Sequence, residues 1–119
     1  MNKSLEALWG VVYGDVSSLD QFNGGVVVFE TNRIFGGDSC FYYTGTYNSS
    51  GADLSAQVKI THFSGPDLTA FGLQVSGSLQ IQIKATREGD KIFGTMWPVD
   101  QPDNCLAIIF VHLEDLPNP

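Results

Sequence analysis

The sequence predicts an all-β protein: a small eight-stranded up-and-down barrel with one short helix. Apolar and polar residues alternate over most of the chain with the period of two that is typical of strands with one buried face. Clusters of Gly, Asn, Asp and Ser separate these stretches, as in tight turns. The 119 residues are enough for a real core. We therefore expect a single domain over 1–119, with an ordered part at about 7–114.

The first half of the chain predicts four strands separated by polar turns. The stretch 24–47 organises the rest, because it holds three β-branched or aromatic runs. Thr31-Asn32 predicts a tight reversal, and Gly36-Gly37-Asp38 predicts a bend rather than a phosphate cradle, because a strand and not a helix follows. Gly14 to Gly25 has the composition of a surface loop. We expect strands over Ala7–Tyr13, Val26–Glu30, Arg33–Phe35 and Cys40–Tyr47.

The second half contains the strongest strand pattern and the helical segment. Between two long alternating stretches, a Pro near the start, an Asp in the first turn and a Gly at the end indicate a short helix at about Pro66–Phe71. Glu88-Gly89-Asp90 predicts a hairpin turn. We expect strands over Leu54–Thr61, Val75–Thr86, Lys91–Trp97 and Cys105–Leu113.

Eight strands joined by short turns favour closure into a barrel. A flat sheet would leave two open edges, whereas a barrel removes them. Glycines within the strands, such as Gly45 and Gly94, are typical of strands that coil sharply. A barrel of eight strands is just wide enough to be filled by side chains or to hold one small ligand. A rolled sheet or a two-layer sandwich is the alternative.

The charge and composition exclude several classes of protein. Apolar residues make up 43% of the chain and charged residues 16%, which are globular values. The net charge of −7 repels phosphate backbones and anionic membrane surfaces, so we expect neither direct nucleic-acid binding nor membrane association. Without a signal-peptide pattern or a transmembrane stretch, we expect a cytoplasmic protein. In that compartment Cys40 and Cys105 stay free thiols.

No catalytic or metal site can be assembled from the sequence. His62 and His112 lie on different expected strands without metal-ligand spacing, so we interpret both as inward-facing imidazoles near a barrel end and predict no enzyme activity and no cofactor. Arg87 continues an apolar face and is interpreted as an arginine at a strand end that keeps its head in water. The candidate lining of an interior cavity is Trp9, Tyr43, Ile60, His62, Ile81, Arg87 and Met96.

Short motifs along the chain are similar to those of the GrlR-like family, that of the negative regulator of the locus of enterocyte effacement. They are Leu8–Val12, Gly25–Glu30, Ile34–Asp38 followed by Tyr42–Gly45, and Lys59–Thr61. The resemblance implies a calycin-like eight-stranded barrel with an apolar interior, a homodimer, and binding of a transcriptional activator rather than DNA. The namesake of the family carries an acidic run where this chain has Asn48–Asp53, with one carboxylate, so the identity of the partner does not carry over.

Two functional hypotheses follow, with an enzyme as a third that no polar triad or metal set supports. The first is a cytoplasmic regulator that acts by binding a protein, as the resemblance implies. The alternative is a carrier or sensor of a small apolar ligand held inside the barrel. The pair of interior arginines that is typical of fatty-acid carriers is missing from the sequence.

The last expected strand predicts a homodimer. It is apolar on both faces, but only one face of a barrel strand reaches the interior. Ile109, Val111 and Leu113 lie on the other face, where a second copy of the chain would cover them. A monomer whose tail, Asp115 to Pro119, folds back over this face is the alternative.

Overall fold

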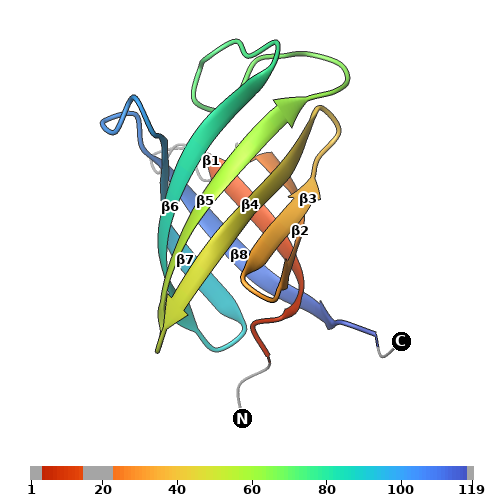
Figure 1. The fold of residues 1–119 in the computed structure, drawn as a ribbon, viewed down its shortest axis with the longest axis vertical. Coiled ribbons are helices and arrows are strands. Elements are labelled where there is room, and N and C mark those ends of the chain that lie inside the picture. The colour runs from red at the N-terminus through yellow and green to blue at the C-terminus, as the bar shows by residue number, and fades with distance from the viewer. Residues whose placement is uncertain (1–3, 15–22, 118–119) are drawn as a thin grey trace.

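The computed structural model describes residues 4–14 and 23–117, and it confirms the predicted all-β barrel of eight strands (Figure 1). All pairs of neighbouring strands are antiparallel. The strands are β1 (Ala7–Gly14), β2 (Asn23–Glu30), β3 (Arg33–Gly37), β4 (Phe41–Ser50), β5 (Asp53–His62), β6 (Ser78–Glu88), β7 (Lys91–Pro98) and β8 (Leu106–Asp115).

The first and last strands close the barrel. Each strand pairs with the next in sequence, and β8 then pairs with β1, with Val11 opposite Phe110. None of the described strands therefore keeps an unpaired edge. The β1–β8 register shifts where Leu8 pairs with Glu114 and Trp9 with His112, which is a β-bulge.

Glycines allow neighbouring strands to approach closely. A Cβ atom at Gly45 would collide with the carbonyl oxygen of Gln57 on β5, and one at Gly94 with that of Lys84 on β6. A larger residue would push these strands apart. The prediction that these two glycines serve the coiling of the strands fits these contacts.

Alternation along each strand places apolar side chains inside the barrel. In β5, Leu54, Ala56 and Val58 are buried, while the residues between them are more exposed. The same pattern places Leu106, Ile108 and Phe110 of β8 in the interior and Ile109 and Val111 outside. Burial of these rows supplies the main favourable free energy of folding.

The two ends of the barrel are built differently. At the lower end in Figure 1, β2 and β3 join through Thr31 and Asn32, both with positive φ, as in a two-residue hairpin turn. The upper end carries the β3–β4 turn (38–40), the segment between β5 and β6 (63–77, here the cap segment) and the β7–β8 loop (99–105). The upper end is therefore where the longer connections gather.

The helix predicted at Pro66–Phe71 is wrong. The cap segment instead turns back on itself: the Val75 N–H donates to the Asp67 carbonyl, the Thr69 N–H donates to the Leu73 carbonyl, and Leu68 and Gln74 form an antiparallel bridge. Gly72 takes a positive φ of 80°, which a helix interior excludes. Of the residues that suggested helix ends, Pro66 directly precedes this small hairpin, and Gly72 lies in the turn at its tip, between Thr69 and Leu73.

Other differences concern strand ends. β6 begins at Ser78 and not at Val75, because 75–77 belong to the return of the cap segment. Of the loop expected at 14–25, residues 15–22 lie outside the described part of the chain, and Asn23 to Gly25 already pair with β1. In the part that the structure describes, no helix has the length and apolar character needed to cross a membrane.

Candidate functional site

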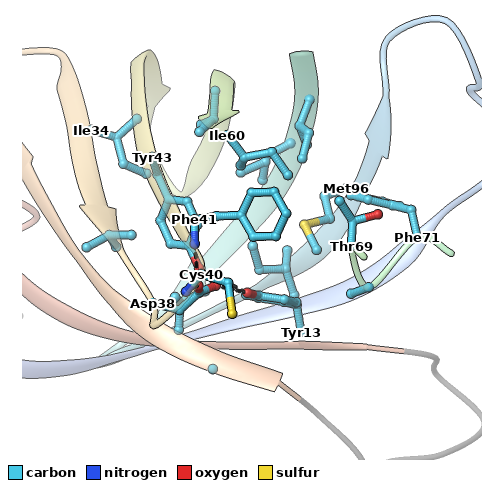
Figure 2. A pocket seen from close by; sticks show the side chains of 18 of the residues that line it. Tyr13, Ile34, Asp38, Cys40, Phe41, Tyr43, Ile60, Thr69, Phe71 and Met96 are labelled. Atoms are coloured by element: carbon cyan, nitrogen blue, oxygen red, sulfur yellow. Dashed lines mark hydrogen bonds between the residues drawn. The ribbon is translucent and has the colours of Figure 1, made fainter. Parts of the chain in front are cut away.

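A cavity of about 380 Å³ occupies the upper part of the barrel interior (Figure 2). Every strand contributes to its wall. Its lining is Val11, Tyr13, Gly24, Val27, Ile34, Asp38, Ser39, Cys40, Phe41, Tyr43, Val58, Ile60, Leu68, Thr69, Ala70, Phe71, Ile81, Ile83, Met96, Ile108 and Phe110. The wall is mainly apolar, and polar lining side chains such as Asp38, Ser39 and Thr69 come from the β3–β4 turn and the cap segment, at the upper end of the barrel.

Large aromatic side chains fill the lower part of the interior. The ring of Phe29 lies 5.9 Å from Trp9, 5.1 Å from Tyr47 and 5.5 Å from Phe110, measured between centroids. Trp9 and Phe29 have no exposed surface. The upper wall uses aliphatic residues such as Val58 and Ile83, whose smaller volume leaves the space open.

The cap segment reaches over the cavity. Phe71 is buried and lines it, and its carbonyl accepts a hydrogen bond of 3.2 Å from Asn104 Nδ2 in the β7–β8 loop. The Thr69 hydroxyl donates to the Leu73 carbonyl at 2.9 Å and fixes the turn that carries Phe71. In Figure 2, Thr69 and Phe71 lie across the cavity from Asp38.

Three polar side chains form a cluster at the cavity wall, here the Tyr–Asp–Tyr cluster: Tyr13 of β1, Asp38 of the β3–β4 turn and Tyr43 of β4. Asp38 Oδ2 accepts hydrogen bonds from the Tyr13 hydroxyl at 2.7 Å and the Tyr43 hydroxyl at 2.5 Å. The two hydroxyl oxygens lie 2.9 Å apart. Two tyrosines, from β1 and β4, thus converge on one carboxylate oxygen of the β3–β4 turn (Figure 2).

Backbone geometry holds the cluster in place. The other carboxylate oxygen, Asp38 Oδ1, accepts hydrogen bonds of 2.8 Å from the N–H groups of Cys40 and Phe41, as in an Asx turn. Gly25 leaves room for the Tyr43 hydroxyl, because a Cβ atom there would lie 3.1 Å from it. The carboxylate therefore accepts four hydrogen bonds.

These contacts set the protonation of the cluster. Burial alone would raise the pKa of Asp38, but the hydrogen bonds from Tyr43, the Cys40 N–H, Tyr13 and the Phe41 N–H outweigh it and hold that pKa below its ordinary value. Burial, together with the neighbouring carboxylate, raises the pKa of Tyr13 and of Tyr43 well above the ordinary tyrosine value. At neutral pH the cluster holds one carboxylate and two neutral hydroxyls.

Of the seven residues predicted to line a cavity, four do so: Tyr43, Ile60, Ile81 and Met96. Trp9 does not, because it belongs to the aromatic filling below the cavity. The His62 ring lies against Phe41, and its Nε2 is 2.8 Å from the Gly65 carbonyl, so this histidine supports the cap segment instead.

Arg87 also does not line the cavity, although the sequence predicted it to do so, because it lies near the lower end of the barrel. Its guanidinium carbon lies 5.4 Å from the centroid of the Trp9 ring, and its Nε donates to the Gly89 carbonyl at 2.8 Å. His112 points inward, as expected, with a side chain 2% exposed. Its Nε2 lies 3.0 Å from Asp115 Oδ1, while its Nδ1 is buried with no hydrogen-bond partner among the described residues.

Tyr13 and Asp38 belong to the site but not to the lining predicted from the sequence. Asp38 was interpreted only as part of a bend, although an Asp after Gly-Gly that precedes an aromatic strand is well placed to bond the N–H groups that follow. Tyr13 carried one signal, since it follows Trp9 and Val11 on the inward face of β1. Nothing in the sequence brings these two residues together, because 25 positions separate them.

Other reactive side chains are dispersed. Cys40 is half-buried at the cavity, Cys105 is exposed, and both are free thiols. Within the described ranges, no three His, Cys, Asp or Glu side chains are placed to hold a metal ion. Compared with protein-family models and with curated proteins, the chain matches no family model and no curated sequence.

Proposed function

We propose that the protein binds a small apolar molecule inside its barrel, as a carrier or sensor that catalyses no reaction. The observation that carries this proposal is the apolar cavity of about 380 Å³ to which all eight strands contribute. Its volume lies within the range of about 300–1,000 Å³ that is usual for small-molecule sites. An apolar cavity lined by aliphatic side chains loses dispersion contacts when empty, and an apolar ligand restores them.

The architecture supports a calycin-like classification as part of this proposal. A closed antiparallel barrel of eight strands with a filled lower end and a cavity at the upper end is the arrangement in which such barrels hold one ligand. The motifs shared with the GrlR-like family agree with the same classification, and they suggest that ligand binding serves regulation in the cytoplasm.

A fluorescent probe tests the binding proposal. N-phenyl-1-naphthylamine, a neutral apolar dye, should gain fluorescence on binding the wild-type protein. Val58→Trp places a large ring in the cavity and should weaken dye binding at least tenfold. Gln57→Trp adds the same ring at the neighbouring, exposed position of β5 and should leave binding unchanged. Equal dye binding by the two variants would place the dye outside the cavity and count against the proposal.

A second function, protein binding by a homodimeric regulator, is favoured by the outside of the barrel. Apolar outward-facing residues of β3, β2, β1, β8 and β7 gather into one apolar outer face, in which Val12 pairs with Ile109 and Ile109 with Phe93. The charged Glu30, Arg33 and Lys91 face outward at the ends of their strands. The face comprises Leu8, Val12, Val26, Val28, Phe35, Phe93, Ile109, Val111 and Leu113. Apart from Tyr42, the outward residues of β4 to β6 are polar by contrast, as in the pairs Thr44–Lys59 and Gln57–Gln82.

We propose that a second copy of the chain covers the apolar outer face through a two-fold contact, with Ile109 and Val111 at its centre. The tested variant is Ile109→Asp with Val111→Lys, and its sedimentation should be that of a folded monomer. Gln57→Asp with Gln82→Lys is the matched control on the polar half and should sediment as wild type. A dimer that survives the first variant would exclude β8 from the interface. Capture of a transcriptional activator by the wild-type protein alone would support the regulatory part.

A further inference from the structure

We infer that the cavity selects an apolar molecule whose polar end is a hydrogen-bond donor, a hydroxyl or an ammonium group, and that it rejects carboxylates. This inference rests on the proposed ligand-binding function and specifies the chemistry of the ligand. It is carried by the geometry of the Tyr–Asp–Tyr cluster, which is the main polar feature of the wall.

Counting protons in the cluster shows what it can offer a ligand. Asp38 Oδ2, Tyr13 Oη and Tyr43 Oη form a triangle with sides of 2.7, 2.5 and 2.9 Å. Each hydroxyl has one proton to donate. Both protons go to the carboxylate, which then accepts four hydrogen bonds in all, or one hydroxyl donates to the other, which donates to the carboxylate, and the total is three. In each arrangement both protons stay within the triangle, so lone pairs of the tyrosine oxygens remain for a ligand.

The charge of the cluster points in the same direction. The four hydrogen bonds that Asp38 accepts favour its ionised form, so the polar end of the cavity is negative at neutral pH. The described lining contains no Lys, Arg or His to compensate an incoming anion. At the cluster, a carboxylate head group would meet a like charge and no free tyrosine proton, whereas an ammonium or hydroxyl would donate to the tyrosine oxygens.

The other polar side chains of the wall do not change this preference for a donor over a carboxylate. The Thr69 hydroxyl already donates to the Leu73 carbonyl. Ser39 is exposed and lies 3.6 Å from the Cys40 sulfur, measured from Oγ to Sγ. A bound molecule would therefore place its apolar body among the aliphatic residues of β5, β6 and β8, with its donor group toward Tyr13 and Tyr43 (Figure 2).

Four compounds that share an unbranched ten-carbon chain test the preference on the wild-type protein: 1-decanol, decylamine, decanoate and decyl methyl ether, each titrated by displacement of N-phenyl-1-naphthylamine. The alcohol should bind about tenfold more tightly than the ether, which accepts but cannot donate a hydrogen bond. The amine should bind at least as tightly as the alcohol, and decanoate should bind most weakly. Decanoate that binds as tightly as the alcohol would overturn the inference.

A single isosteric change supplies a second test. Asp38→Asn removes the charge and adds an N–H₂ group, while its amide oxygen can still accept from the Cys40 and Phe41 N–H groups. The tyrosine protons are then released toward the cavity, so the preference for alcohol over ether should vanish and decanoate should bind more tightly. Asp53→Asn removes an exposed carboxylate at the start of β5 and should keep the wild-type order.

The outcomes separate this inference from the function on which it rests. Equal binding of all four compounds by wild type would refute the donor preference and leave the binding cavity standing. Failure of every compound and of the dye to bind would refute both. If wild type and Asp38→Asn bind the four compounds in the same order of affinity, the cluster does not distinguish their head groups. That outcome would also overturn the inference.

Discussion

Replacement of Asp38 by Ala tests how much the Tyr–Asp–Tyr cluster contributes to the fold. The carboxylate accepts two backbone N–H groups and two hydroxyls, and the variant loses all four hydrogen bonds. A hydrogen bond contributes about 0.5–1.5 kcal/mol net. Because Asp38 is only half-buried and water replaces part of what is lost, the lower half of that range applies. The expected loss in the free energy of unfolding is therefore about 2–4 kcal/mol.

Thermal unfolding followed by circular dichroism measures this loss. At about 4 °C per kcal/mol for a chain of this size, Tm should fall by roughly 8–16 °C. Asp38→Asn keeps an acceptor for the two backbone N–H groups, so it should lose about half as much. The control Asp53→Ala, at an exposed position, should stay within about 0.5 kcal/mol of wild type. If Asp38→Ala and the control Asp53→Ala have the same Tm, the four hydrogen bonds of Asp38 do not stabilise the fold.

Three further predictions use the same measurement. The stability advantage of wild type over Asp38→Asn should be complete above the ordinary carboxyl pKa of 3.8 and should be lost as the pH falls through the lower pKa of the folded state. An advantage that grows as the pH falls below 3.8 would contradict it. Trp9→Ala should cost about 3–5 kcal/mol, because Trp9 is fully buried in the aromatic filling, and a loss below 1 kcal/mol would show that the lower end repacks. Gly94→Ala should cost at least ~2 kcal/mol through the collision with β6, while Gly77→Ala, with open space around it, should be nearly neutral.

The alternation of residues was enough to predict the barrel. Apolar residues spaced by two, such as Leu54, Ala56 and Val58, lie on one face only if the segment is a β-strand. Short turns between such segments favour antiparallel pairing of strands that are neighbours in sequence. The cap segment was different. Its Pro and Gly are compatible with either a helix or a hairpin, and the choice depended on the hydrogen bonds of Thr69, which a local pattern does not reveal.

The candidate site was only partly predictable for a related reason. Inward-facing positions such as Ile60 and Met96 follow from alternation, and both line the cavity. Whether an inward-facing residue lines the cavity or packs in the filled part depends on the size of side chains from other strands. For this reason the prediction that Trp9 and Arg87 line the cavity is wrong. The Tyr–Asp–Tyr cluster depends on the closeness of β1, β2 and β4 at the upper end, which only the closed barrel fixes.

The pairing of β1 with β8 has a consequence for synthesis on the ribosome. Trp9 finds its partner His112 only when the last strand has left the exit tunnel, and at about 5–20 residues per second this delay lasts roughly 5–20 s. During that interval β1 pairs on one side only, and its free backbone groups and the apolar row beside it are open to other nascent chains. A permuted gene that encodes β8 directly before β1 would let these two strands pair as a hairpin, but β8 would then wait for β7 instead. The strand with free backbone groups during synthesis should therefore change from β1 to β8, without altering the finished barrel.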